Sequence, residues 1–274
     1  MIRGIFRLLW LGGVVAAAAL DALRIKYFYR DPSGARVLFT SRWARQFLRC
    51  FGVTCTVQGS PPVQGVLASN HLSYLDILVL ASVAPMTFVA KAEVSRWPVF
   101  GWLCRQAGTL FIRRDQRMDV QRLSEEMSAQ LNRGTVVALF PEGTSTGGTS
   151  VLPFHSSLFA PLEGRDIQAT PAFIQYQLAD GSVENDVCYW RNMTFAWHLL
   201  NLLTKRQVSV SVKFGNPVCG VRNRKQLATE LHRRVRQLGG FTASTVSRGL
   251  VERATAATAT QSPKPSMLCV NAAT

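Results

Sequence analysis

The residues of this chain that are best suited to chemistry are His71 and Asp76, which lie five positions apart. They fall between the apolar run 65–68, which predicts a buried strand, and the apolar run 77–81, which predicts a helix. Within one helix, five residues would separate the two side chains by roughly 140°. If His71 lies in the turn before the helix, Asp76 can accept one ring N–H and leave the other nitrogen to take a proton from a hydroxyl.

A plainer interpretation of the same residues stays open. The hydroxyl of Ser73 suits an N-cap, which puts Asp76 at the third helical position, where an acidic side chain belongs to a capping box. His71 would then be an ordinary turn residue. The remainder of the sequence has to decide between the two.

The composition predicts one large domain with an anionic partner. The chain has 274 residues, of which 47% are hydrophobic, so it can bury one substantial core. Its formal net charge of +15 favours nucleic acid, a phosphorylated ligand or an acidic membrane surface as partner. No basic-aromatic module for nucleic acid is visible, and the hydrophobic N-terminus favours the membrane.

Neither a metal site nor a disulfide framework is predicted. The six cysteines form no Cys-x-x-Cys pair, and no Cys/His cluster has the spacing of metal ligands. We expect reduced, mostly buried thiols, with Cys104 in a packing role. His155 and His198 stand in apolar surroundings, which is typical of core residues.

The two ends of the chain differ from its middle. Residues 1–30 place the uncharged run 8–20 between cations, which predicts a membrane anchor that spans the bilayer or enters one leaflet. A cleaved secretory signal and a buried core helix are the alternatives. The flanking cations lean toward an inner-membrane protein whose main domain, residues 31–240, faces the cytoplasm. Residues 241–274 are rich in Ala, Thr and Ser and predict a disordered tail.

Strand-like and helix-like segments alternate through the main domain, which predicts an α/β fold with a parallel or mixed sheet flanked by helices. The basic amphipathic segment 41–51 suits either a helix on an anionic bilayer or a cover for the core. The aromatic stretch 97–102 suits lipid contact or a corner of the core. The expected strands are 53–57, 65–68, 87–91, 108–114, 136–140, 169–174 and 208–214, and the expected helices include 120–131 and 221–238.

Polar blocks lie at or beside four of these strands, namely 70–76, 108–114, 140–144 and Pro171. Because the ends of parallel neighbours meet at one edge of a sheet, we expect the blocks to gather where ligands bind. The blocks, in this order, resemble those of the 1-acylglycerol-3-phosphate acyltransferase (lysophosphatidate acyltransferase) family. The resemblance spans roughly residues 60–220 and rests on Asn-His-x4-Asp followed by Phe-Pro-Glu-Gly-Thr.

The resemblance implies a role for each block. His71 would be the general base on the acceptor hydroxyl, and Asp76 would orient it. The implied substrate-binding residues are Arg113 and Arg114 for the anionic head group, Glu142, Gly143 and Thr144 for the acceptor pocket, and Pro171 for the acyl-donor side.

The implied reaction transfers a fatty acyl chain to a lysophospholipid, chiefly 1-acylglycerol 3-phosphate, at a membrane. Acyl-CoA or acyl carrier protein would be the co-substrate, and no further cofactor is expected. The alkoxide formed by the base would attack the thioester directly, without an acyl-enzyme, and backbone N–H groups at a helix start would stabilise the oxyanion.

One residue departs from the family pattern. Phosphate-accepting members usually carry an arginine after Glu-Gly-Thr, but this chain has Ser145, which cannot replace a bidentate guanidinium contact. The segments 142–148 and 151–154 resemble a bacterial subgroup that includes acyltransferases for lyso-ornithine lipid, which is therefore the alternative acceptor. A non-catalytic protein that binds anionic membranes through its basic charge is a third hypothesis.

Overall fold

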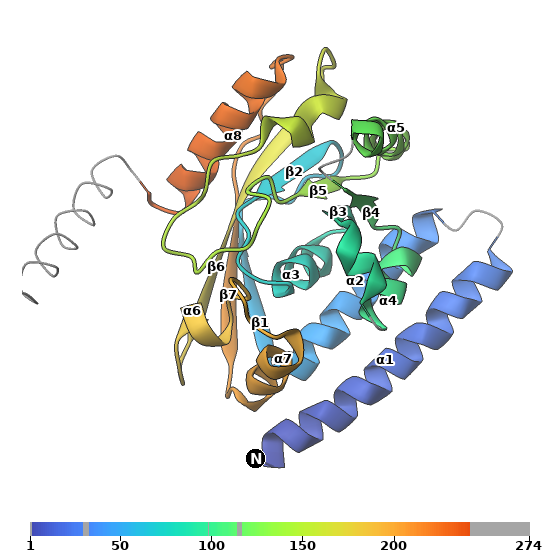
Figure 1. Ribbon diagram of the computed structural model, residues 1–274, viewed down its shortest axis with the longest axis vertical. Helices are drawn as coiled ribbons and strands as arrows, with labels where there is room; N and C mark the ends of the chain where they lie inside the picture. Colours follow the sequence, from blue (N-terminus) through green and yellow to red (C-terminus); the bar gives the residue numbers. More distant parts are fainter. Residues whose placement is uncertain (1, 30–32, 98, 114–116, 242–274) are drawn as a thin grey trace, which may run out of the picture. The chain divides into compact units, whose positions relative to one another are not determined.

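The computed structural model of the chain describes residues 2–29, 33–97, 99–113 and 117–241 (Figure 1). Its strands form one sheet in the order β1-β7-β6-β2-β5-β3-β4, in which neighbours are parallel except for the antiparallel pair β6 and β7. The predicted α/β fold with a mixed sheet is confirmed. The strands are β1 (Val53–Gln58), β2 (Val66–Ser69), β3 (Thr87–Lys91), β4 (Leu110–Ile112), β5 (Val137–Leu139), β6 (Ala169–Leu178) and β7 (Val208–Phe214).

Helices cover both faces of this sheet (Figure 1). On one face α2 and α3 share an apolar core with α1 and α7, whereas α5, α8 and η2 enclose a second core on the other face. The helices are α1 (Ile2–Phe28), α2 (Ser33–Phe51), α3 (Leu75–Val83), α4 (Phe100–Gln106), α5 (Arg117–Asn132), α6 (Val183–Asp186), α7 (Phe195–Thr204) and α8 (Arg224–Leu238), with 3₁₀ helices η1 (Ala92–Arg96) and η2 (Ser156–Leu162).

The central strand β2 is buried on both sides, as is usual for parallel strands with helices on each face. Leu67 belongs to the core on the α3 face, whereas Val66 and Ala68 belong to the core on the α8 face. The polar turn that follows β2 is therefore anchored to a strand that packs in both directions.

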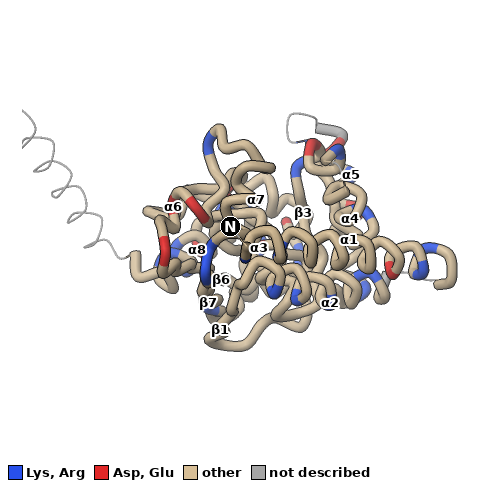
Figure 2. Tube along the Cα trace, turned by 90° about the horizontal axis from the view of Figure 1, so that it is seen from below, with Lys and Arg blue, Asp and Glu red and all other residues tan. Residues whose placement is uncertain are grey.

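One face of α1 packs on the domain and the other faces are exposed. Its buried residues recur at helical spacing and are Leu11, Val14, Ala18, Ala22 and Ile25. Near its start, the Arg7 guanidinium donates to the backbone oxygens of Lys205 at 2.6 Å and Arg206 at 3.3 Å, at the end of α7. The helix is long and apolar enough to cross a membrane, and its middle carries no charge (Figure 2).

The structure describes one of the open segments and adds a helix that was not predicted. The segment 41–51 is part of α2, whose Phe47, Leu48 and Phe51 are buried, so this helix covers the core. Helix α7 has no counterpart among the predicted helices, because its apolar residues are not confined to one stripe. Within the predicted tail, residues 242–274 lie outside the described residues.

Candidate active site

Two polar turns meet at the carboxyl ends of neighbouring parallel strands. β2 leads into the turn 70–74, and β5 leads into the loop 140–152. Because β2 pairs in parallel with β5, the carboxyl ends of these two strands lie at the same edge of the sheet. Open α/β sheets bind their ligands at this edge.

His71 and Asp76 are in direct contact at the start of α3. Nδ1 of His71 lies 2.8 Å from Oδ2 of Asp76, and His71 itself precedes the helix. The Asp76 side chain is fully buried, whereas that of His71 is 21% exposed. The backbone N–H groups of Leu72 and Ser73 donate to the same Oδ2 at 2.6 and 2.9 Å. One buried carboxylate therefore holds both the imidazole and the turn that carries it.

The predicted N-cap at Ser73 is wrong. Residue Tyr74 occupies the N-cap position without a capping side chain, and the Ser73 hydroxyl is buried with no hydrogen-bond partner among the described residues. The Asp76 carboxylate satisfies the N–H groups of the turn instead, because an ionised oxygen is a stronger acceptor than a hydroxyl.

The contact with Asp76 determines which nitrogen of His71 can react. An ionised carboxylate only accepts hydrogen bonds, so Nδ1 carries the hydrogen and Nε2 keeps a free lone pair. The carboxylate also stabilises the imidazolium that forms when Nε2 takes a proton. Phe140 stacks on the imidazole with ring centroids 4.2 Å apart, which restrains the ring plane. This arrangement suits a general base acting on a hydroxyl.

Glu142, in the loop after β5, holds the backbone of the same turn. Its Oε1 accepts the His71 N–H and its Oε2 accepts the Leu152 N–H, both at 2.8 Å. The residue is 2% exposed, and burial raises the pKa of its carboxyl to about 7 although both N–H groups act in the opposite direction. Its two oxygens thus face backbone groups that position His71.

Gly143 and Thr144 continue this loop beside the turn. Gly143 has a φ of +76°, which favours glycine. Two residues after Thr144, which is exposed, the N–H of Thr146 donates to the carbonyl oxygen of His71 at 3.0 Å. The loop therefore contacts both backbone groups of His71, the N–H through Glu142 and the C=O through Thr146.

Ser145 joins a third segment, between β6 and α7, to the site. Its hydroxyl donates to the backbone oxygen of Tyr189, and the Tyr189 N–H donates to the Leu72 oxygen at 2.9 Å. The indole of Trp190 lies so close to Gly147 that a Cβ atom there would come within 2.7 Å of the ring. Ser145 therefore links the segments around the turn at the position where an arginine was expected.

The predicted head-group arginines lie farther from the turn. Strand β4 is three positions from β2 in the sheet, or about 14 Å at the usual strand spacing. Arg113, which follows β4, donates to Asp119 through Nε at 2.9 Å and Nη2 at 3.3 Å. These bonds lower the pKa of the Asp119 carboxyl. Arg114 lies outside the described residues.

Pro171 is also apart from the dyad of His71 and Asp76. It lies within β6 beside Ala68 of β2, and it lines a cavity of about 510 Å³ with Leu238 of α8. Its side chain is thus on the α8 face of the sheet, whereas Asp76 belongs to α3 on the other face.

A second buried contact involves Tyr74 and His198. The Nε2 atom of His198 lies 3.1 Å from the Cys188 carbonyl oxygen, which can only accept, and its Nδ1 lies 3.1 Å from the Tyr74 hydroxyl. Burial lowers the pKa of His198, so the neutral ring accepts from Tyr74. His198 is a core residue, but the same expectation for His155 is wrong, because His155 lies exposed in the segment before η2.

The contacts of Asn70 and Tyr176 could not be found from the sequence. The Tyr176 phenol donates to Oδ1 of Asp76 at 2.7 Å. The Asn70 side chain accepts from the Ile174 N–H at 2.7 Å and donates to the Ile174 oxygen at 3.0 Å. The only sequence signal for Tyr176 was its position on one side of an apolar strand, and that pattern is typical of an ordinary core residue.

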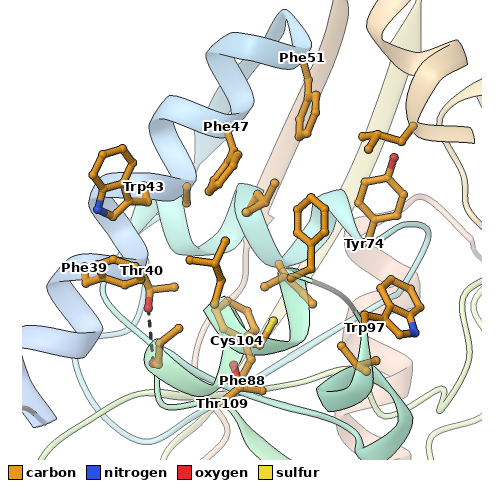
Figure 3. A pocket seen from close by; sticks show the side chains of 18 of the residues that line it. Phe39, Thr40, Trp43, Phe47, Phe51, Tyr74, Phe88, Trp97, Cys104 and Thr109 are labelled. Atoms are coloured by element: carbon orange, nitrogen blue, oxygen red, sulfur yellow. Dashed lines mark hydrogen bonds between the residues drawn. The ribbon is translucent and has the colours of Figure 1, made fainter. Parts of the chain in front are cut away.

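Figure 3 shows an apolar cavity of about 130 Å³, which Tyr74 and Ile77 line from the turn and from α3. Phe88 lines it, and the Phe88 ring lies 6.4 Å from Phe140, which stacks on His71. Figure 3 shows Tyr74 at one end and Phe39 at the other. Further lining residues from α2, α4 and α7 are Trp43, Phe47, Phe51, Leu103, Cys104 and Phe195.

Known acyltransferases are similar to this chain. A family model described as Acyltransferase matches residues 54–174, which include the turn at His71 and the loop at Glu142. The lyso-ornithine lipid O-acyltransferase of Pseudomonas aeruginosa is 35% identical over 237 residues, which are 84% of this chain and 90% of that protein. The chain belongs to the acyltransferase family.

Other acyltransferases match over different lengths. The 1-acyl-sn-glycerol-3-phosphate acyltransferase of Neisseria gonorrhoeae is 43% identical over 96 residues, which are 35% of this chain and 38% of that protein. The crystal structure of the 1-acyl-sn-glycerophosphate acyltransferase PlsC from Thermotoga maritima has a TM-score of 0.65 at 19% identity and covers 88% of this chain and 97% of its own. This likeness establishes the shared fold.

The raised pKa of Glu142 predicts a pH-dependent stability. The folded protein keeps the Glu142 proton up to about pH 7, whereas an exposed glutamate releases it near pH 4.5. The free energy of unfolding should therefore fall as pH rises between these values, by about 3 kcal/mol for one such group. Thermal and urea unfolding of the Glu142→Gln variant should lack this fall.

Glu126 of α5 offers the matched control, since Glu126→Gln removes a half-exposed carboxylate that pairs with Arg122 of the same helix and not with the turn. It should leave the pH dependence unchanged. Above about pH 7, where Glu142 is ionised, Glu142→Gln should also cost about 1–3 kcal/mol in stability, because an amide has one acceptor oxygen where a carboxylate has two. If the free energy of unfolding of the Glu142→Gln variant fell with pH as steeply as that of the wild type, the fall would not come from Glu142.

Proposed function

We propose that this acyltransferase moves a fatty acyl chain from acyl-CoA or acyl carrier protein to the hydroxyl of a lysolipid at the membrane. One observation carries this proposal. The oriented base His71 lies near an apolar cavity that suits an acyl chain. The rings of Phe140 and Phe88 lie between His71 and this cavity. The base and the cavity are the two elements that such a transfer needs.

The proposed chemistry is direct transfer. Nε2 of His71 takes the hydroxyl proton, the alkoxide oxygen attacks the thioester carbonyl, and collapse of the tetrahedral intermediate releases the thiolate, which takes the proton from His71. The N–H groups of His71, Leu72 and Ser73 already bind carboxylates. The donors that stabilise the oxyanion must therefore lie outside these residues.

The acceptor that we propose is lyso-ornithine lipid, which carries an amino-acid head group in place of a phosphate. Ser145 stands where phosphate-accepting members of the family carry an arginine, and its hydroxyl donates to the backbone oxygen of Tyr189. Arg113 is paired with Asp119. A head group without phosphate suits such a site. The relative from Pseudomonas aeruginosa, which matches over 84% of this chain, also bears that name.

A second candidate acceptor is 1-acylglycerol 3-phosphate. The 96-residue match at 43% identity is to a protein named for this substrate. The reaction and the role of His71 would be the same, and only the group that binds the head would differ.

We propose that the protein lies on the cytoplasmic face of the inner membrane, with α1 in one leaflet. The packed stripe of α1 and the bonds of Arg7 to the end of α7 hold this helix against the domain. The opposite face exposes large apolar residues to the bilayer, among them Ile5, Phe6, Leu9, Leu20 and Leu23. Water-soluble acyl donors would then reach the site from the cytoplasm.

The acceptor assay tests this function. Membranes containing the full chain receive labelled acyl-CoA with either lyso-ornithine lipid or 1-acylglycerol 3-phosphate. We expect a higher kcat/KM for lyso-ornithine lipid, and a loss of about 10²- to 10⁴-fold in the His71→Ala variant, which lacks the base. The exposed His155 offers the control His155→Ala, which should retain activity.

The two parts of this proposal fail separately. Phosphatidic acid as the only product would overturn the proposed acceptor while leaving the acyl transfer in place. Turnover that survives His71→Ala would overturn the role of His71. Vesicle binding without turnover of either acceptor would favour the non-catalytic alternative.

The cavity predicts a dependence on chain length. Ala107 lines the end of the cavity where its backbone oxygen lies 3.4 Å from the Thr40 hydroxyl, so Ala107→Phe should shorten the space. Each methylene of the donor acyl chain that no longer fits in the cavity should cost about 0.8 kcal/mol, or roughly fourfold in kcat/KM. With a series of acyl-CoA donors, the Ala107→Phe variant should therefore prefer shorter acyl chains than the wild type does.

The exposed Ala129 of α5 provides the control Ala129→Phe, for which no change is expected. An unaltered chain-length profile in a folded Ala107→Phe protein would mean that the acyl chain lies elsewhere.

A further inference from the structure

The two oxygens of Asp76 have different partners. Oδ2 receives the imidazole N–H of His71 and the backbone N–H groups of Leu72 and Ser73. Oδ1 receives the phenol of Tyr176, at 2.7 Å, from β6 on the far side of the carboxylate. Tyr176 is thus one contact removed from the base.

Tyr176 is held as a hydrogen-bond donor. Its side chain is buried, and this burial together with the neighbouring Asp76 charge raises the pKa of the phenol well above its usual range. The phenol therefore stays protonated at any pH at which an acyltransferase is assayed. The phenol donates its hydrogen to Oδ1 of Asp76, because a carboxylate oxygen accepts hydrogen bonds.

The position of Tyr176 is set by the same turn that carries His71. The Asn70 side chain binds both backbone groups of Ile174, two residues before Tyr176 on β6. Residues two apart on a strand face the same side, so the Asn70 contact fixes the level of Tyr176 relative to the turn. On the outer side β7 pairs with β6 and places Val210 opposite Tyr176.

We propose that Tyr176 is a positioning residue that tunes the basicity of His71 through Asp76. This inference rests on the proposed role of His71 as general base. A hydrogen bond to Oδ1 stabilises the carboxylate charge and lessens the attraction of the carboxylate for a protonated imidazole. His71 thus releases its proton more readily, and more of it is present as free base at a given pH.

Other ionisable groups surround this chain of contacts. Glu142 approaches His71 from the loop after β5, and its pKa of about 7 lies in the range of an enzyme assay. Cys188, from the segment before α7, faces Asp76, and Cys55, from β1, faces Tyr176. Burial raises the pKa of both thiols, that of Cys188 to about 12, so they remain uncharged. Among the described groups named here, Glu142 is the one that has to be separated from His71 in a pH profile.

The test compares the pH dependence of kcat/KM in the Tyr176→Phe variant and the wild type, in the full chain reconstituted in vesicles with the better of the two lysolipid acceptors. The acidic limb reports deprotonation of the base in the free enzyme. Without the phenol, His71 should hold its proton more tightly, so this limb should move upward by about one pH unit. The variant should also be less stable, because a buried charged acceptor has lost its donor.

A second substitution should shift the acidic limb of the pH profile toward lower pH. Replacement of Tyr176 by 3-fluorotyrosine keeps the shape of the side chain but makes the phenol a stronger donor, so the acidic limb should shift downward. A merely structural Tyr176 would change the amount of active protein in either variant and leave the limb where it is. The exposed Tyr27 gives the control Tyr27→Phe, with no shift expected.

The contribution of Glu142 is removed by repeating the comparison in the Glu142→Gln background. A shift that persists there belongs to His71 and supports the proposal, whereas one that disappears belongs to Glu142 and overturns it. An unshifted limb in both Tyr176 variants also overturns it. If the wild type itself transfers no acyl group, the proposed function has failed instead, and if transfer survives His71→Ala, the proposed role of His71 has failed.

Discussion

The candidate active site depends on one buried acidic side chain, the carboxylate of Asp76. Removing a carboxylate from water is strongly unfavourable unless hydrogen-bond donors surround it. The imidazole of His71 and two backbone N–H groups of its turn satisfy one oxygen, and the Tyr176 phenol satisfies the other. A shift of the turn, of α3 or of β6 would leave an oxygen without donors. The need to satisfy this charge therefore fixes these three elements relative to one another.

The neighbouring strands contact this centre through backbone groups. Asn70 joins the turn to β6, Glu142 joins it to the loop after β5, and Ser145 together with the Tyr189 N–H joins it to the segment before α7. Most polar groups of the turn are engaged in holding the imidazole. The proposed proton transfer takes place at the ring edge of His71, while the apolar cavity lies beyond the aromatic rings on the α2 and α3 side.

The sequence predicted the parts of this architecture that local pattern controls. Apolar runs located the strands, and the turn between 65–68 and 77–81 brought His71 within reach of Asp76. Contacts between distant segments were not predictable in this way. Tyr176 is a hundred positions from Asp76, and its side of β6 resembles any buried face. The cap assigned to Ser73 failed because a carboxylate on the same turn is the stronger acceptor.

The most direct test of this account is the tautomer of His71, measured by nitrogen-15 NMR of the full chain in micelles with labelled histidine. The chain has four histidines, so the His71→Gln variant assigns the signal. The account predicts that neutral His71 carries its hydrogen on Nδ1 and leaves Nε2 bare, and that the Asp76→Asn variant loses this preference. A wild-type His71 with the hydrogen on Nε2 would contradict it, since that ring could neither donate to Asp76 nor accept a proton from a substrate hydroxyl at Nε2.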